Sequence, residues 1–589
     1  MTQLKKEIAA LQSLLKREGI DMYFVPSGDD HSSEYVHDHY KTREFLTGLS
    51  GESGEVVVTQ EAAWLWTDSR FYLQAEQVLK GTGITLMRAG EEGVPEPEVF
   101  MASLREARGY QVLGFDGSTL NKRRGESLRK ALPGITIKAD SDLAGSIWEN
   151  RPSLVPTKMF SLPENVTGKK STEKISDVRR AMKEKAMDAL LISDLTETAW
   201  LFNMRARDVS YIPVFFSYAL ITEDSVTLYL KDGSLDPESV PEGLRFITLK
   251  NYASIKSDLA NLPSGTRLWL DGRYTSDTLY HQIPDSVRVL DAPTPVELMK
   301  AIRNETEIAS TKKAHLKDAL AVTKFLYNIK KTVKERPLTE LDASQMLYDY
   351  RKEQGNLLDL SFETITGYGP NGAIVHYAPT PETNAPLKAE GFLLADSGGQ
   401  YLEGTTDITR TVALGPLTDE MKKIYTIVLK GHLAMAMASL PLEATGLDID
   451  QIARAPIRKA GYDFKHGLGH GVGHLLACHE GPNILRRVAT PCPLLHHMTI
   501  TDEPGLYLDG KFGVRIENEL LIHATEDDKF FLPLTLVPYE REAIDASLLT
   551  DAELNSINAY HEEVQNALLP HLDGALRDFL VYATQPIFK

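Results

Sequence analysis

A helix end followed by a short apolar strand occurs twice in the N-terminal part of this chain. Residues 15–25 read LKREGIDMYFV, and residues 182–192 read MKEKAMDALLI. Segments in which helix and strand patterns alternate are typical of α/β domains. We therefore predict two related α/β domains, the first at residues 1–156 and the second at residues 157–302.

Size and charge narrow the classes of protein that this chain fits. Its 589 residues are enough for about three or four domains. The net charge of −18 disfavours nucleic acid and anionic membranes as partners. Two cysteines, Cys478 and Cys492, do not make a disulfide framework and favour a reducing compartment. No uninterrupted apolar run resembles a signal peptide or a membrane span. We expect a cytoplasmic protein.

A third region begins near residue 303. Residues 305–335 carry apolar side chains at helical spacing. Residues 367–519, which follow, are dense in glycine, histidine, aspartate and glutamate, so the chemistry is expected there. We predict a catalytic domain at residues 303–540 and a helical extension at residues 541–589.

Two aspartates flank a predicted hairpin in this region. An apolar strand delivers Asp396 to the turn SGG, and Asp407 lies early in the returning strand at residues 406–414. Two antiparallel strands can place both carboxylates on one face. Like charges at such a distance are costly unless a cation lies between them. For this pair alone, a turn-stabilising role for Asp396 is the simpler interpretation.

Residues 466–474 read HGLGHGVGH, so glycines separate the histidines. Glycine lets the backbone turn sharply and approach a ligand closely. Imidazole is a ready ligand for divalent metals. Taken alone, the segment fits a flexible loop with exposed histidines equally well. His479 follows closely, in HEGP.

Two further candidate ligands, Glu503 and Glu517, lie in TDEPGLY at residues 501–507 and GVRIENE at residues 513–519. In the second segment Arg515, Glu517 and Glu519 share one strand face, and a solvated face is the usual outcome for such a pattern. Asp396, Asp407, Glu503 and Glu517 give the region four candidate carboxylate ligands, and a histidine adds one more ligand. Oxygen-rich ligand sets favour manganese, and two ions roughly 3.5–4 Å apart can activate one water for hydrolysis.

The motifs DSG, TTDITRT, HGLGHGVG, TDEPG and RIEN resemble, in order and character, those of the pita-bread metallopeptidases. This family includes methionine aminopeptidase, prolidase and aminopeptidase P. The resemblance implies two divalent ions bridged by Asp407 and Glu517. It also implies that Asp396 completes one coordination shell and that His470 with Glu503 completes the other.

The resemblance extends to residues around the metals. Glu503 is expected to accept a proton, and His376 and His479 are expected to stabilise the intermediate and protonate the leaving nitrogen. The residues that it assigns to substrate binding are Arg70, His376, His466, His470, His479 and Arg515. His474 and Glu519 receive no role, and we expect both to face solvent.

Two N-terminal domains resemble the long, three-domain cytosolic form of aminopeptidase P, whereas prolidases carry one. The implied fold is two creatinase-type α/β domains followed by an α+β pita-bread domain. The implied activity is hydrolysis of the N-terminal Xaa-Pro bond by a hydroxide that bridges two metals, manganese first and zinc or cobalt as alternatives. The implied partners are peptides with proline in second position and a second copy of the chain. A prolidase stays an alternative, whereas the complete ligand set disfavours a non-catalytic peptide-binding module and a metal-free creatine hydrolase.

Overall fold

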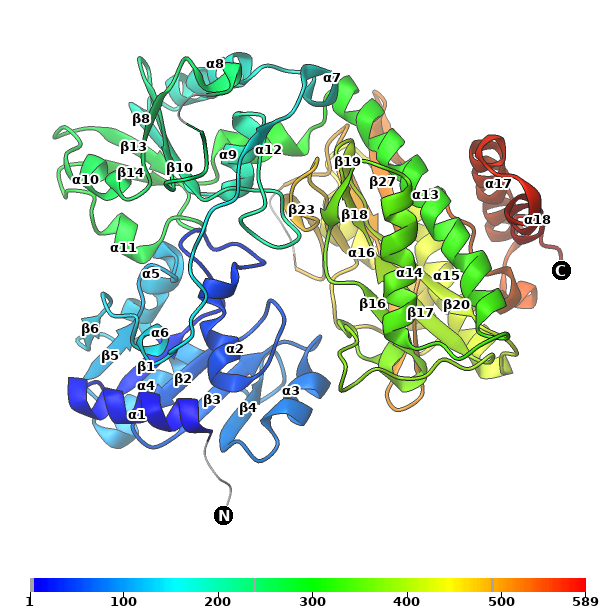
Figure 1. Cartoon of the computed structure of the whole chain (residues 1–589), viewed down its shortest axis with the longest axis horizontal. Coiled ribbons are helices and arrows are strands. Elements are labelled where there is room, and N and C mark those ends of the chain that lie inside the picture. The colour runs from blue at the N-terminus through cyan, green and yellow to red at the C-terminus, as the bar shows by residue number, and fades with distance from the viewer. Residues whose placement is uncertain (1–4, 237–239, 489–491) are drawn as a thin grey trace. The chain divides into compact units, whose positions relative to one another are not determined.

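The computed structural model describes residues 5–236, 240–488 and 492–589 (Figure 1). The chain divides into two compact units. Unit 1 comprises residues 1–162 and 169–296, and unit 2 comprises residues 163–168 and 297–589. Within the described ranges, no helix is both long enough and apolar enough to cross a membrane.

Unit 1 contains two six-stranded sheets with the same topology. The strands of the first sheet are β1 (Met22–Val25), β2 (Glu55–Thr59), β3 (Ala63–Thr67), β4 (Ile84–Arg88), β5 (Val112–Phe115) and β6 (Thr136–Lys138). Those of the second are β8 (Ala189–Ile192), β10 (Ser217–Thr222), β11 (Val226–Leu230), β12 (Thr248–Asn251), β13 (Arg267–Leu270) and β14 (Arg288–Asp291). The orders are β4-β3-β2-β1-β5-β6 and β12-β11-β10-β8-β13-β14. The two strands whose sequences are similar, β1 and β8, hold the same position, as a duplication predicts.

The first sheet shows why its sequence folds in this way. Helix α1 (Lys6–Glu18) ends at Gly19, whose φ of 63° lies in the left-handed region that glycine adopts without strain. The helix buries Ile8, Leu11 and Leu15 in the same apolar cluster as Val56 of β2. Strand β1 is buried along its whole length between antiparallel β2 and parallel β5. An uninterrupted apolar run therefore suits a central strand.

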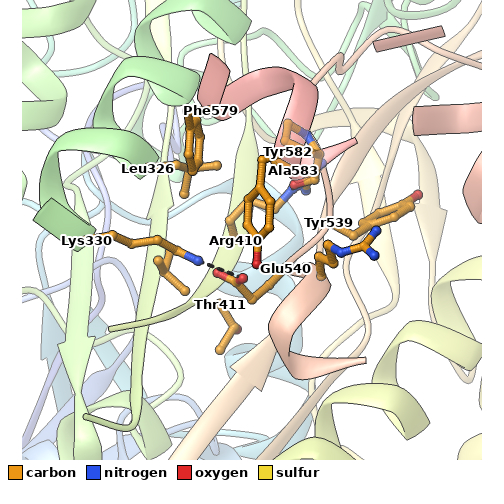
Figure 2. Close-up of a pocket in the computed structure, with 12 residues that line it drawn as sticks. Leu326, Lys330, Arg410, Thr411, Tyr539, Glu540, Phe579, Tyr582 and Ala583 are labelled. Carbon is orange, nitrogen blue, oxygen red and sulfur yellow. Dashed lines mark hydrogen bonds and ion pairs between the residues drawn. The ribbon is translucent and has the colours of Figure 1, made fainter. Parts of the chain in front are cut away.

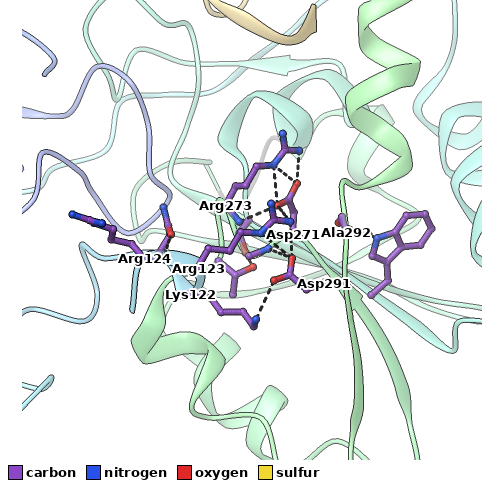
Figure 3. Close-up of polar contacts among 12 residues, drawn as sticks. Lys122, Arg123, Arg124, Asp271, Arg273, Asp291 and Ala292 are labelled. Carbon is purple, nitrogen blue, oxygen red and sulfur yellow. Dashed lines mark hydrogen bonds and ion pairs between the residues drawn. The ribbon is translucent and has the colours of Figure 1, made fainter. Parts of the chain in front are cut away.

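Ion pairs connect the two halves of unit 1 (Figure 3). Asp291, at the end of β14, accepts hydrogen bonds from Lys122 Nζ at 3.0 Å and Arg123 Nη2 at 2.8 Å. Both cations belong to α5 (Lys122–Ala131) of the first half. From the same helix, Arg129 binds both carboxylate oxygens of Asp277 at 2.5 and 2.8 Å. The negative charge of each of these aspartates is therefore balanced by cationic side chains of the protein.

Unit 2 is built on a long helix and several antiparallel sheets. Its principal helices are α13 (Glu305–Thr332), α14 (Glu340–Glu353), α15 (Asp419–Ala436), α16 (Gly446–Lys459), α17 (Asp551–Leu568) and α18 (Gly574–Ala583). Helix α13 matches the predicted helical pattern and begins with a capping box between Asn304 and Glu307. Helices α17 and α18 form the helical tail that the sequence predicted.

The strands of unit 2 fall into four groups. The first three are β16 (Ile365–Tyr368), β17 (Phe392–Ser397) and β20 (Ile408–Ala413); β25 (Gly505–Leu508) and β26 (Phe512–Arg515); and β15 (Leu357–Leu360), β18 (Gly399–Tyr401) and β19 (Gly404–Thr405). The largest sheet has the order β21-β28-β27-β24-β22-β23, from β21 (Leu440–Pro441), β28 (Asp528–Pro533), β27 (Asn518–Ala524), β24 (Thr499–Asp502), β22 (Gly469–Gly471) and β23 (Glu480–Leu485). Every predicted metal ligand lies on these strands or immediately beside them.

The C-terminal helices pack onto this unit around a pocket (Figure 2). Lys330 of α13 donates to Glu540 Oε1 at 2.8 Å beside Arg410 of β20. Phe579 and Tyr582 of α18 line the same pocket. The tail is therefore part of the folded unit.

Candidate metal centre

The hairpin of β17 and β20 brings the two aspartates of the DSG and TTDITRT motifs together. In this pair Asp396 lies opposite Thr409, and Asp407 immediately precedes β20. Both carboxylates are buried, with 7% and 3% of each residue exposed. The predicted strand pair is present. Asp407 lies just before the returning strand rather than within it.

His470 joins this pair from β22. Its Nε2 lies 3.4 Å from Asp407 Oδ2 and 3.6 Å from Glu503 Oε1. Its Nδ1 lies 2.9 Å from the carbonyl oxygen of Gly471, which can accept a hydrogen bond but cannot donate one. In the neutral ring Nδ1 therefore carries the proton, and the Nε2 lone pair points at the carboxylates. That arrangement suits a metal ion between them.

Glu517 completes the cluster from the segment between β26 and β27. Thr409 Oγ1 donates to Glu517 Oε2 at 2.6 Å, and the Glu517 amide donates to the Thr409 carbonyl at 3.1 Å. Ligand atoms of Asp407, His470 and Glu517 all lie within 4.8 Å of one another. The segments that carry these three predicted ligands are far apart in the sequence, and the fold brings them together.

Burial and repulsion disfavour the negative charge that collects here. Burial raises the pKa of Glu517 well above its usual range, and repulsion from Asp407 and Asp396 raises it further. Burial also raises the pKa of Glu503 to about 7, although His470 opposes the rise. At Asp407 burial acts in the same direction, but contacts with His470, His479 and Cys478 together outweigh it and lower the pKa. Bound cations would relieve this excess of negative charge.

Asp396 supplies a second indication that cations belong here. Its Oδ2 accepts from Arg515 Nη2 at 2.5 Å. Its Oδ1 is buried and finds no hydrogen-bond partner among the described residues. A buried carboxylate oxygen without a partner is costly, and a divalent cation would satisfy it. The donor set of carboxylate oxygens and one imidazole nitrogen thus fits two divalent ions.

A directed chain of hydrogen bonds extends from Asp396 to His466. Arginine can only donate, so Arg515 Nη1 donates to Tyr507 Oη at 2.8 Å. Tyr507 in turn donates to His466 Nε2 at 2.9 Å, because the other ring nitrogen faces the Gly467 carbonyl at 2.6 Å. Burial, followed by the charge of Arg515, holds the pKa of His466 well below its usual range. His466 is therefore a neutral acceptor.

The sequence interpretation did not identify Tyr507 as a site residue. Glu503 lies between β24 and β25, which belong to different sheets, so alternation along one strand gave no signal for Tyr507.

The remaining predicted histidines also lie in unit 2. The ring of His479 stands 4.3 Å from that of His470, measured between centroids, at an interplanar angle of 76°. His376 follows η3 (Gly369–Ala373) and interacts electrostatically with both Asp396 and His466. These histidines therefore border the carboxylate cluster.

Arg70 belongs to unit 1, where it is held by two carboxylates. Its Nη1 donates to Glu52 Oε1 at 2.8 Å, and its Nη2 donates to Asp68 Oδ2 at 2.7 Å. Its role in substrate binding stays a prediction.

The expectation that His474 and Glu519 face solvent was wrong. His474 is 2% exposed, with Nδ1 3.2 Å from Thr311 Oγ1, and Glu519 is fully buried, with Oε2 3.1 Å from His315 Nε2. Glu519 lies in strand β27, and its side chain packs against His315 of helix α13, which is also buried. Arg515 and Glu517 are also buried, so the interpretation that their strand face is solvated was wrong.

Comparison with known proteins agrees with this geometry. Residues 309–524 match metallopeptidase family M24, and residues 530–587 match the C-terminal region of peptidase M24. Residues 7–147 and 150–307 each match a creatinase/prolidase N-terminal domain. The chain belongs to metallopeptidase family M24, with two creatinase-type domains before a pita-bread domain, as predicted.

The chain is similar to curated relatives over nearly its whole length. It is 36% identical to Xaa-Pro aminopeptidase 1 of Dictyostelium discoideum, over 97% of this chain and 94% of that protein. It is also 36% identical to aminopeptidase P1 of Arabidopsis thaliana, over 98% and 99% of the two chains. Among solved structures, X-prolyl aminopeptidase from Caenorhabditis elegans, a cytosolic enzyme with a di-nuclear active site, superposes with a TM-score of 0.93, 29% identity and 99% coverage of both chains.

Proposed function

We propose that this chain is an Xaa-Pro aminopeptidase that releases the N-terminal residue of peptides with proline in second position. The convergence of Asp407, His470 and Glu517 within 4.8 Å carries the proposal. The chain's full-length similarity to proteins named for this activity supports it.

The residues that would hold two divalent ions are Asp396, Asp407, His470, Glu503 and Glu517. Such ions lower the pKa of a bound water and polarise a carbonyl oxygen. The oxygen-rich donors favour manganese over metals that prefer sulfur, with zinc and cobalt as alternatives. Arg515 holds Asp396 in place through its contact with Oδ2.

The protein's own groups move the protons. Glu503, whose side chain is 21% exposed at the edge of the cluster, accepts the proton of the attacking water. His479 and His376 donate hydrogen bonds to the developing oxyanion and deliver a proton to the leaving nitrogen. That nitrogen belongs to a tertiary amide without an N–H. A substrate site beside His466 would therefore select the proline ring by shape rather than by a hydrogen bond.

We further propose the features that the fold leaves open. The division at residues 1–156, 157–302, 303–540 and 541–589 is the proposed domain organisation. Arg70 contacts the substrate from the first domain, and His470 contributes to substrate binding as well as to metal binding. The protein acts as a homodimer in the cytoplasm. The cytosolic location of the Caenorhabditis elegans enzyme supports the proposed location.

Hydrolysis of an Xaa-Pro-Xaa tripeptide by metal-stripped protein, with and without added manganese, tests the proposal. Release of the first residue only after manganese is restored is the expected result. Cleavage of an Xaa-Pro dipeptide but not of the tripeptide would make the protein a prolidase. No cleavage of either peptide would favour a peptide-binding module.

A further inference from the structure

The thiol of Cys478 lies against a predicted metal ligand. Its Sγ donates to Asp407 Oδ2 at 3.2 Å, and the residue is fully buried. The next residue, His479, is half-buried. Ligand atoms of Asp407, Cys478 and His479 all lie within 4.8 Å of one another. One sulfur, one nitrogen and one oxygen donor thus converge beside the cluster of Asp407, His470 and Glu517.

The turn that carries these two side chains is anchored at both ends. The amide of Ala477 donates to Glu480 Oε1 at 3.2 Å. Lys300 Nζ donates to Glu480 Oε2 at 2.5 Å, and both side chains are almost completely buried. Ligands presented from a rigid turn lose little conformational freedom when they bind a metal. The Cys478–His479 pair is preorganised in this sense.

The donor types favour softer metals than manganese, the first choice for the catalytic site. Thiolate ligands favour zinc and cadmium, whereas oxygen ligands favour manganese. A tetrahedral zinc ion with bonds of about 2.0–2.3 Å separates its ligand atoms by roughly 3.3–3.8 Å. The contact of 3.2 Å between Cys478 and Asp407 is close to that separation, and a ring nitrogen of His479 lies within 4.8 Å of both of these ligand atoms.

We propose that Asp407, Cys478 and His479 form a second, inhibitory site for a soft divalent ion such as Zn²⁺ or Cd²⁺. As the ion binds, the sulfur–hydrogen bond breaks, the proton passes to solvent, and the sulfur bonds to the ion. The ion then coordinates His479, and it shares Asp407 with the proposed catalytic metal site. Inhibition of peptide hydrolysis by this ion rests on the proposed function, whereas binding of the ion to Asp407, Cys478 and His479 does not.

Cadmium binding tests the site without reference to activity. Manganese-loaded protein is titrated with Cd²⁺ while the ultraviolet charge-transfer absorbance of a cadmium–thiolate bond is recorded. Wild type is expected to give this absorbance with one Cd²⁺ per chain. Cys478→Ser, which offers only a hard oxygen, is expected to lose it and to bind Cd²⁺ at least ~10-fold more weakly. An absent band in wild type, or an equal band in Cys478→Ser, would overturn the proposal.

Two more variants make this result decisive. Cys492→Ser is the matched control, because its Sγ contacts the Pro493 carbonyl at 3.3 Å. It is expected to keep the absorbance of wild type. Cys478→Val replaces the thiol with an apolar group of similar size, so it must lose the band as Cys478→Ser does. Circular dichroism confirms that each variant is folded, and a folded Cys478→Val that keeps the band would contradict the assignment.

Zinc inhibition of tripeptide hydrolysis is the second arm. The zinc concentration for half-inhibition should rise at least ~10-fold in Cys478→Ser and stay unchanged in Cys492→Ser. Equal sensitivity of Cys478→Ser and wild type would overturn the inhibitory role. If no variant cleaves peptides, the proposed function fails, and the cadmium titration still decides whether the site exists.

Discussion

Asp291 in unit 1 and the pair Asp396 and Glu503 in unit 2 differ in what balances their negative charge. In unit 1, burial acts to raise the pKa of Asp291, but hydrogen bonds and charge from Arg123 and Lys122 outweigh it and hold the pKa at about 2. In unit 2, burial raises the pKa of Asp396 and brings that of Glu503 to about 7. The first carboxylate is stabilised in its charged form by the protein, whereas burial outweighs the attraction of Arg515 at Asp396 and of His470 at Glu503.

This difference separates a structural ion pair from a ligand cluster. A carboxylate that is paired with lysine and arginine needs no bound cation to stay charged. Asp291 is such a carboxylate, and its ion pairs link the two halves of unit 1. Carboxylates that gather on several strands with a raised pKa are stable as anions only when cations arrive from outside. The carboxylate cluster of Asp396 and Glu503 therefore indicates a metal centre, whereas Asp291 forms a structural ion pair within unit 1.

The largest expected effect comes from removing one charge of the cluster. Asp407→Asn should lose metal, and its activity should fall by more than the roughly 10–100-fold that loss of an outer-shell partner costs. Metal content by mass spectrometry and kcat/KM on a tripeptide check this. The matched control is Asp277→Asn in unit 1, which should keep metal and activity in its folded fraction. Equal metal loss in both variants would contradict the assignment of the metal site to the cluster that contains Asp407.

His479→Ala should affect chemistry and leave the metals in place. Loss of a general acid typically lowers turnover by about 10²–10⁴-fold, and His479 is not among the predicted ligands of the two metals. The exposed His571 provides the control, since His571→Ala should behave as wild type. Wild-type turnover in His479→Ala would remove the residue from the mechanism.

Tyr507→Phe tests the chain from Arg515 to His466. The variant keeps the ring but loses the hydroxyl that accepts from Arg515 and donates to His466. We expect kcat/KM to fall about 10-fold, with metal content retained. Tyr582→Phe alters a hydroxyl in the pocket of Figure 2 instead and should leave kcat/KM unchanged. An equal effect of both variants would show that the hydroxyl of Tyr507 has no specific role.

The smallest effect is expected at Asp291. Asp291→Asn should destabilise unit 1 by about 1 kcal/mol, because Arg123 is partly exposed and solvent screens the pair. All five tryptophans lie in unit 1, so their fluorescence during urea unfolding reports on this unit. Metal content should not change.

The same aspartate predicts a pH dependence. Its folded pKa of about 2 lies below the usual value near 3.9, so its contribution is complete above about pH 4 and is lost as the pH falls towards 2. Asp291→Asn should lack this part of the acid destabilisation. Identical acid-unfolding curves for variant and wild type would contradict the assigned pairing.

Much of the architecture could be predicted from sequence because it depends on local patterns. The apolar strands at residues 22–25 and 189–192 and the hairpin between Asp396 and Asp407 are examples. The burial of Glu519 could not be predicted, since it depends on helix α13, which comes from a distant part of the sequence and places His315 against it. The hydroxyl of Tyr507 was missed for a related reason, because its partners, Arg515 and His466, come from other segments.

The number of manganese ions that the metal-stripped protein binds at equilibrium tests whether the carboxylate cluster of unit 2 is a two-metal site. Two ions per chain in wild type, with fewer in Asp407→Asn and still two in Asp277→Asn, is the result that we predict. One ion or none in folded wild-type protein would contradict the account, because the buried carboxylates of unit 2 would then be stable without the cations that we infer.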